Sequence, residues 1–244
     1  MYVIELNLRA SRTIPFISKV TGVNFAALAV DAYFENPKER LIQNIPYVAV
    51  KAPQFSFARL PGADPVLRVE MSSTGEVACF GETAAEAFLK ATYATGFAVK
   101  KKGVLFTVGG TVQKEKMLDA AWKLASLGFT IYTTENTHKF LAEHHVPSIR
   151  VSKIYEGMHP NVIDVIRNGD VSIVINIQEN FDKYTEDFDE QVADGYRIRR
   201  AAVEKNALLL TDIILARFFV KALKKYKMED LKISPWDEYL KKLK

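Results

Sequence analysis

The sequence is poor in cysteine and has no long apolar run. Among 244 residues there is one cysteine, Cys79, so an internal disulfide is excluded and a reducing compartment is expected. No uninterrupted apolar stretch approaches the roughly 20 residues that cross a bilayer. The opening residues, MYVIELNLRA, do not have the basic and then apolar layout of a signal peptide. We therefore expect a cytoplasmic protein without a membrane partner.

Histidine is also scarce, and its spacing does not indicate a metal site. A zinc site needs ligands that converge from one face, together with cysteines or carboxylates. Cys79 is expected to be a small core residue rather than a reactive thiol. The four histidines are His138, His144, His145 and His159.

The remaining composition is that of an ordinary globular protein, with 48% apolar and 25% charged residues. The net charge is +4, and the tail Lys221–Lys244 holds eight lysines and four acidic residues. These lysines alternate with apolar residues and no arginine-rich pattern accompanies them, so we expect a docked tail and no nucleic-acid partner.

A change in composition at Thr95–Gly103 divides the chain into two parts. Its lysines and glycines indicate a linker, so we place one part at residues 1–98 and another at residues 99–244. The first part is expected to contain an opening strand, a helix at Asn24–Phe34, a strand at Tyr47–Pro53 and a helix at Ala84–Thr95.

The second part alternates apolar strands with helices, which is typical of a parallel sheet covered on both faces. The fold class is therefore α/β, a three-layer parallel-sheet domain of about 120 residues. The expected strands are Val104–Val108, Phe129–Thr133, Val171–Asn176 and Ala207–Leu210; the expected helices are Lys114–Leu127, Asn136–Glu143, Pro160–Arg167, Arg197–Asn206 and Thr211–Leu223.

Polar residues follow several of these strands, where ligands of open α/β sheets are bound. Hydroxyl and free backbone N–H groups at a helix start can hold an anion, and lysines add positive charge. Helix capping explains the threonines equally well when they are taken alone. Together these strand ends predict a phosphate or carboxylate site, and its candidate residues are Lys114, Thr133, Thr134, Asn136, Thr137, Lys153, Asn176 and Gln178.

The opening stretch VIELNLRASR carries a second group of polar residues. Glu5, Asn7 and Arg9 alternate with apolar residues, so on a strand they face the same side. A carboxylate beside an amide oxygen suits Mg²⁺, and the guanidinium groups of Arg9 and Arg12 suit phosphate.

Several segments resemble the C-terminal part of the carbamoyl phosphate synthetase large subunit. VIELNLRASRTIPFISKVTG and VKAPQFSFARLPGADPVLRVEMSSTGEVACFGET are similar to the end of its second ATP-grasp half. GFTIYTTENT, NGDVSIVIN and RIRRAAVEKNALLLT are similar to its regulatory domain, which has a methylglyoxal synthase-like fold. The resemblance implies a truncated α+β ATP-grasp remnant at residues 1–98 and the regulatory domain at residues 99–244, in an enzyme of pyrimidine and arginine biosynthesis.

In that family the opening strand closes the carbamate-kinase active site. The resemblance implies that Glu5 and Asn7 hold metals and that Arg9 and Arg12 contact the transferring phosphoryl group. Mg²⁺ or Mn²⁺ and ATP are expected only in the complete enzyme, because the phosphate loop and adenine pocket would precede Glu5. We expect no synthetase activity from this chain alone, and we expect the remaining large-subunit segments and a glutaminase small subunit as partners.

The resemblance also implies an allosteric effector, either a nucleotide monophosphate or N-acetylglutamate. The resemblance implies that Lys114, Thr134, Thr137, Lys153 and Asn176 bind it. Glu135 places negative charge beside that site, either to favour the helix dipole or as a likeness to acylglutamate-binding members. The identity of the effector therefore stays open.

Two other functions are considered. A lyase of the methylglyoxal synthase type needs a carboxylate base next to its phosphate pocket. Glu179 and Asp182 follow the third strand, but neither stands in the glycine–glycine–aspartate context of those enzymes. The second alternative is a freestanding metabolite-sensing domain.

Overall fold

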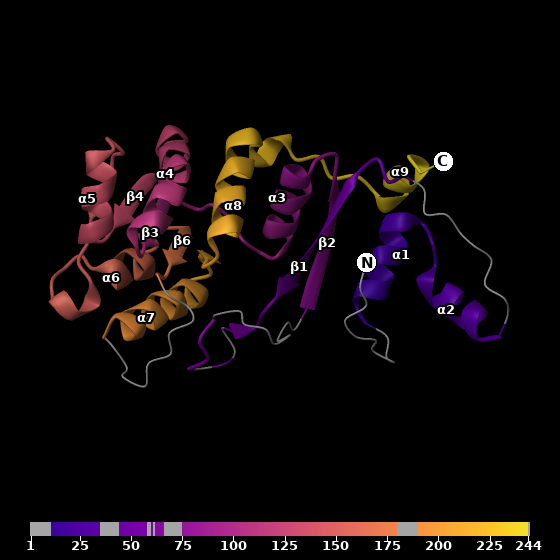
Figure 1. Ribbon diagram of the computed structural model, residues 1–244, viewed down its shortest axis with the longest axis horizontal. Coiled ribbons are helices and arrows are strands. Elements are labelled where there is room, and N and C mark those ends of the chain that lie inside the picture. The colour runs from indigo at the N-terminus through magenta and orange to yellow at the C-terminus, as the bar shows by residue number, and fades with distance from the viewer. Residues whose placement is uncertain are drawn as a thin grey trace.

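A computed structural model describes residues 11–34, 44–57, 60, 62–65, 75–179 and 190–243 of the chain. A parallel sheet with the strand order β5-β4-β3-β6-β7 occupies one end of the molecule (Figure 1). This arrangement confirms the α/β class. The strands are β3 (Gly103–Val108), β4 (Thr130–Thr133), β5 (Ile149–Arg150), β6 (Ile173–Ile177) and β7 (Leu208–Leu210).

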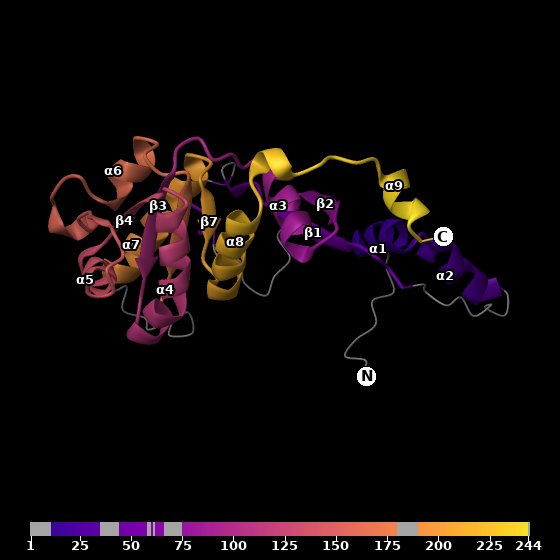
Figure 2. The same cartoon turned by 90° about the horizontal axis from the view of Figure 1, so that it is seen from above.

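Helices cover both faces of this sheet (Figure 2). The larger hydrophobic core lies on one face, and the smaller core lies on the other. The helices of the first face are α4 (Thr111–Ser126), α5 (Glu135–Glu143) and α8 (Ile213–Lys225); those of the second are α6 (Val162–Arg167) and α7 (Glu190–Glu204).

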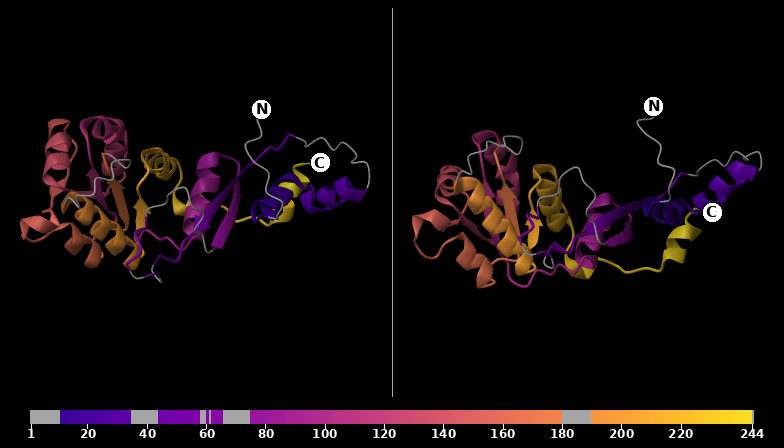
Figure 3. Two further views of the ribbon diagram at one scale, coloured as in Figure 1. Left: turned by 60° about the horizontal axis from the view of Figure 1, so that its bottom comes forward. Right: turned by 90° about the horizontal axis from the view of Figure 1, so that it is seen from below.

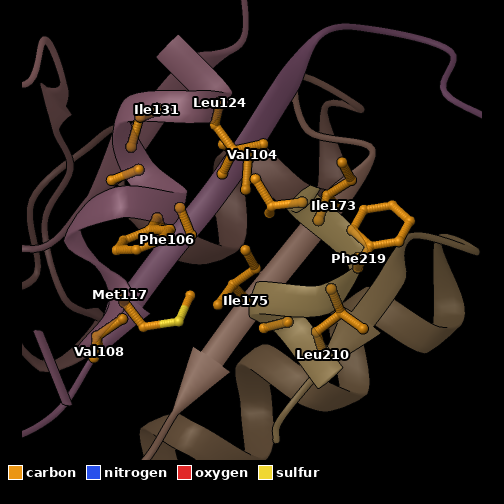
Figure 4. Close-up of a cluster of buried hydrophobic side chains, with 14 of the residues drawn as sticks. Val104, Phe106, Val108, Met117, Leu124, Ile131, Ile173, Ile175, Leu210 and Phe219 are labelled. Carbon is orange, nitrogen blue, oxygen red and sulfur yellow. The ribbon is translucent and has the colours of Figure 1, made fainter. Parts of the chain in front are cut away.

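Successive side chains of the central strand β3 point to opposite faces of the sheet, so the strand contributes residues to both cores. Val104 and Phe106 of β3 point into the larger core, where they lie beside Ile173 and Ile175 of β6 (Figure 4). Leu105, between them in sequence, belongs to the smaller core. Both strands are buried on two faces, which explains their continuous apolar sequences.

Two of the predicted helices begin earlier than their periodicity indicates. Helix α4 starts at Thr111 rather than Lys114, and α7 starts at Glu190 rather than Arg197. The predicted boundaries were wrong because the first turns contain few apolar residues.

The part that precedes the sheet domain contains an antiparallel pair of strands, β1 (Val48–Gln54) and β2 (Gly75–Gly81). Helix α3 (Ala84–Ala94) follows, with its first turn capped by the Thr83 hydroxyl. Phe88 of α3 packs edge-on against Phe218 of α8, with 5.1 Å between ring centroids. This contact joins α3 to the sheet domain.

Two further helices lie at the opposite end of the molecule from the sheet (Figure 3). They are α1 (Thr13–Thr21) and α2 (Phe25–Phe34). No single helix of the described chain has the length and apolarity needed to cross a membrane; only α1 and α2 taken together do, and they are bent by 103°.

The C-terminal tail returns to this end of the molecule. After α8, the chain forms the 3-10 turn Met228–Asp230 and the short helix α9 (Trp236–Lys241) beside α1 (Figures 1 and 2). The Trp236 indole Nε1 donates to the Lys19 carbonyl oxygen at 2.9 Å. The tail is therefore docked, as its alternation of lysine and apolar residues predicts.

Candidate effector site at the carboxyl edge of the sheet

Parallel strands bring three strand ends to one edge of the sheet. The chain leaves β3 through Gly109 and Gly110 and enters α4, which carries Lys114 in its first turns. It leaves β4 through Thr134 and enters α5. Asn176 lies one residue before the end of β6. Both helices therefore direct their free first-turn N–H groups toward this edge.

The two threonines of α5 have different roles in the structure. Thr134 is the N-cap residue, but among the described residues its side chain makes no capping hydrogen bond. Thr137 is 2% exposed, and its hydroxyl donates to the Val108 carbonyl oxygen at 3.2 Å. Thr137 thus ties the start of α5 to the end of β3, while Thr134 leaves its oxygen available to a ligand.

Asn176 belongs to a buried polar network with Thr107 of β3. The Thr107 hydroxyl donates to the Ile175 carbonyl oxygen at 3.3 Å, so its oxygen can only accept a hydrogen bond from Asn176. Asn176 Nδ2 donates to the Thr107 hydroxyl oxygen at 2.9 Å, and this hydrogen bond fixes the orientation of the Asn176 amide. Within the described chain the buried Oδ1 atom of Asn176 is left without a partner.

A second buried oxygen at this edge is also unpaired. Thr133, the last residue of β4, is fully buried, and its Oγ1 atom has no hydrogen-bond partner among the residues described. Most buried polar atoms in folded proteins are paired, so unpaired ones call for an explanation such as a bound ligand or water.

The two charged residues that follow β4 and β5 are engaged locally. The Lys153 ammonium donates to the Tyr155 hydroxyl at 3.0 Å and lies 5.2 Å from the Tyr155 ring centroid. Glu135 pairs with Lys139 at 3.0 Å and with Arg150. The hydrogen bond from Lys139 and the charge of Arg150 lower the pKa of Glu135, although desolvation opposes this shift. These contacts favour the structural role of Glu135 at the helix start.

Glu179 packs closely on the glycine pair, Gly109 and Gly110, that follows β3 at the same edge. Gly110 has a φ of 70°, which favours glycine, and a methyl group there would lie 3.1 Å from Glu179 Cγ. A methyl group on Gly109 would lie 2.8 Å from the Glu179 backbone nitrogen. Two successive glycines between a strand and a helix were the sequence signal for this close approach.

Comparison with known proteins identifies the domain that carries this edge. Residues 116–211 match the family model of the MGS-like domain, where MGS denotes methylglyoxal synthase. The chain is homologous to the C-terminal region of carbamoyl-phosphate synthases.

The three relatives described here are much longer than this chain. The multifunctional protein pyr1-3 of Dictyostelium discoideum is 41% identical over 223 residues, which are 91% of this chain and 10% of that protein. The mitochondrial ammonia-type carbamoyl-phosphate synthase of Homo sapiens is 40% identical over 242 residues, 94% of this chain and 16% of the relative. The multifunctional protein CAD of Squalus acanthias is 40% identical over 235 residues, which cover 91% of this chain and 10% of that protein. The chain thus spans about a sixth or less of the length of these relatives.

One functional candidate in the MGS-like domain was missed from sequence. Arg199 of α7 is 2% exposed, and it forms a two-pronged ion pair with Asp64, from Nε to Oδ1 at 2.8 Å and from Nη2 to Oδ2 at 2.6 Å. These two residues are 135 positions apart in sequence. No local pattern could therefore have indicated the pair.

The opening group of polar residues is described only in part. Glu5, Asn7 and Arg9 lie outside the described residues. Arg12 stands at the start of α1 rather than on a strand, and its Nε lies 3.8 Å from the Glu76 carboxylate.

Arg12 also lines a cavity of about 400 Å³ between α1 and the β1–β2 pair, together with Lys51 and Glu76. Across the part of the chain that the structure describes, no three His, Cys, Asp or Glu residues converge as a metal site.

Proposed function

We propose that this chain is the C-terminal portion of a carbamoyl-phosphate synthase large subunit, whose MGS-like domain binds a small anionic effector. The effector is a nucleotide monophosphate or N-acetylglutamate, held by Lys114, Thr134, Lys153 and Asn176, with Thr137 positioning α5. The observation that carries the proposal is the buried Oδ1 of Asn176, which has no partner among the residues that the structure describes, at an edge where two helices begin.

The electrostatics of this edge support an anion. Helices α4 and α5 have 16 and 9 residues, and neither start is closed by a side-chain cap within the described chain. Uncapped helix starts present N–H donors and a partial positive charge to a ligand. Asn176 Oδ1 adds an acceptor, which suits a ligand that also carries an N–H or O–H group, as both proposed effectors do.

The complete enzyme would supply the nucleotide and metal chemistry. Mg²⁺ or Mn²⁺ would neutralise the phosphates of bound ATP during phosphoryl transfer. Glu5 and Asn7 would hold the metal ions, and Arg9 would contact the transferring group. Arg12 and Lys51 place two cations at one cavity, which suits a phosphate contact. The chain alone is proposed to lack synthetase activity.

Helix α2 supports the proposal that further large-subunit segments cover this chain. Its sequence, FAALAVDAYF, has one charged residue, yet none of its residues is buried against the described chain. Val30, Tyr33 and Phe34 are 56%, 83% and 85% exposed. Only Phe25, Leu28 and Asp31 are half-buried and the rest of the helix is exposed. An apolar helix with so little of its surface covered is typical of an interaction surface. A glutaminase subunit and a cytoplasmic location stay predictions.

Charged substitutions on α2 are expected to prevent this docking. Val30→Asp with Tyr33→Asp should weaken association with the separately expressed ATP-grasp segments at least tenfold, measured by sedimentation, because each buries an unpaired carboxylate. Ile233→Asp, at a tail position that is 99% exposed, serves as the control. The proposed surface is refuted if the wild type, the double variant and the Ile233→Asp variant all associate equally well with the ATP-grasp segments.

A thermal-shift panel tests the effector site. Uridine monophosphate, inosine monophosphate, N-acetylglutamate and inorganic phosphate are the probes. A probe at about 100 times its dissociation constant should raise the free energy of unfolding by about 2.7 kcal/mol. Lys114→Met should remove most of this shift, whereas Lys116→Met on the same helix should keep it. A probe that stabilises the Lys114 variant as much as the wild type is bound elsewhere.

The second candidate function is a methylglyoxal synthase-type lyase acting on dihydroxyacetone phosphate. One observation favours it: the Glu179 side chain packs on the glycine pair beside the proposed anion site. A coupled assay for methylglyoxal distinguishes the two functions, and we expect no activity.

A further inference from the structure

Residues near the β1–β2 pair dock onto α7 of the MGS-like domain through three side chains. The docked residues are Phe57, Leu60, Gly62, Ala63 and Asp64. The Tyr196 hydroxyl donates to the Gly62 carbonyl oxygen at 3.0 Å. Arg200 Nη1 donates to the carbonyl oxygens of Phe57, Leu60 and Ala63 at 2.8, 3.0 and 3.3 Å. Arg199 completes the contact through its ion pair with Asp64.

Arg199 uses only part of its guanidinium group for that ion pair. Nε and Nη2 donate to Asp64, but the buried Nη1 atom has no partner among the described residues. The side chain is 3% exposed, so water does not compensate readily for the missing bond. An unsatisfied donor on a buried cation is costly, and this one requires an explanation.

The Nη1 side of the guanidinium lies near Gly195 and the side chain of Gln178, which is the residue after β6. A methyl group at Gly195 would stand 2.9 Å from Arg199 Nη1 and would collide with the Gln178 side-chain nitrogen. Arg199, Gly195 and Gln178 therefore converge, and Gln178 is two residues after Asn176. The same rigid group thus reaches the edge of the proposed effector site on one side and Asp64 on the other.

We infer that Arg199 couples occupancy of the effector site to the position of the docked residues. The inference rests on the proposed function. A ligand that orders the end of β6, or that places an oxygen near Nη1, changes the position of the planar group that also holds Asp64. A cavity of about 400 Å³ also opens between α6 and α7, and Tyr196 and Arg200 line it.

Such coupling acts equally in both directions. If the effector stabilises the docked arrangement by some factor, then loss of that arrangement weakens effector binding by up to the same factor. The docked residues provide a direct reporter, because the N–H groups of Leu60 and Ala63 donate to the carbonyl oxygens of Phe57 and Leu60 at 3.1 and 3.2 Å. Their hydrogen exchange measures how often this segment opens.

The test compares hydrogen exchange of the Leu60 and Ala63 amides with and without the probe that gives the largest shift in the panel above. In the wild type, the saturating probe should slow this exchange by about fivefold, at the low end of typical coupling. Asp64→Asn removes the charge that Arg199 holds, at a side chain that is 36% exposed. In that variant the probe should leave the exchange of the Leu60 and Ala63 amides unchanged. The dissociation constant of the probe should rise by no more than about fivefold.

Asp170→Asn is the matched control, since Asp170 is 34% exposed and pairs with Lys101 at 3.1 Å on the same domain. It should behave as the wild type does. If the probe binds but does not alter exchange at Leu60 and Ala63, the coupling is refuted and the effector site stands. If Asp170→Asn loses the response as well, the effect is general loosening, and the coupling is again refuted. If no probe binds, the proposed function fails and the coupling fails with it.

Discussion

Asn176→Val is expected to abolish the effector-induced stabilisation while leaving the ligand-free protein at least as stable as the wild type. The buried Oδ1 atom has no partner in the described chain, and an unsatisfied buried acceptor costs about 1–3 kcal/mol. Removing it should outweigh the loss of the bond to Thr107, which is worth about 0.5–1.5 kcal/mol. Thr107 keeps its own bond to the Ile175 carbonyl oxygen.

Urea unfolding with and without the best probe measures both effects. Thr107→Val is the control, because it removes the acceptor of the Asn176 amide nitrogen. In the ligand-free protein it should lower the free energy of unfolding by about 1 kcal/mol, whereas Asn176→Val should not lower it. A stable Asn176 variant that keeps the full ligand-induced shift would show that the unpaired oxygen serves no ligand. Proteins commonly give up stability at binding sites in this way.

The sheet domain could be predicted from sequence because its central strands are buried on both faces. The continuous apolar sequence of β6 and the helical spacing after β3 are local signals, and they indicate a parallel sheet without further information. β2 carries a weaker signal, because it is only half-buried over most of its length. The start of α7 was placed too late for a related reason, since its first turns contain few apolar residues.

The sequence predicts that the candidate residues lie at one edge of the sheet, but it does not predict their hydrogen bonding. Strand order brings Thr134 and Asn176 to one edge, and topology alone indicates that edge. Only coordinates could distinguish Thr137, whose hydroxyl donates to Val108, from Asn176, whose Oδ1 has no partner in the described part of the chain. The Arg199–Asp64 pair depends on a contact between distant segments, which periodicity does not report. The roles of Glu5, Asn7 and Arg9 stay predictions.

Tyr239→Ala is expected to destabilise the protein by about 3 kcal/mol, typical of removing a buried aromatic side chain. Tyr239 lies on the tail, is 7% exposed, and packs against Tyr47 and Phe80 with ring centroids 5.4 and 5.2 Å away. Its hydroxyl donates to the Phe80 carbonyl oxygen at 3.2 Å and lies 3.4 Å from the Lys90 ammonium. The side chain therefore belongs to the packing of the β1–β2 pair although it is encoded at the other end of the chain.

Tyr239→Phe separates the ring from the hydroxyl and should cost only about 1 kcal/mol, because Lys90 keeps its ion pair with Glu86 at 2.7 Å. Tyr33→Ala, at a position that is 83% exposed, should have almost no effect on unfolding in urea. A Tyr239→Ala cost as small as that of Tyr33→Ala would mean that the tail contributes nothing to the first part. The expected result has a consequence for the predicted boundary near residue 98. A fragment cut there would separate Tyr239 from Tyr47 and Phe80, so we expect residues 1–98 to be less stable alone than within the full chain.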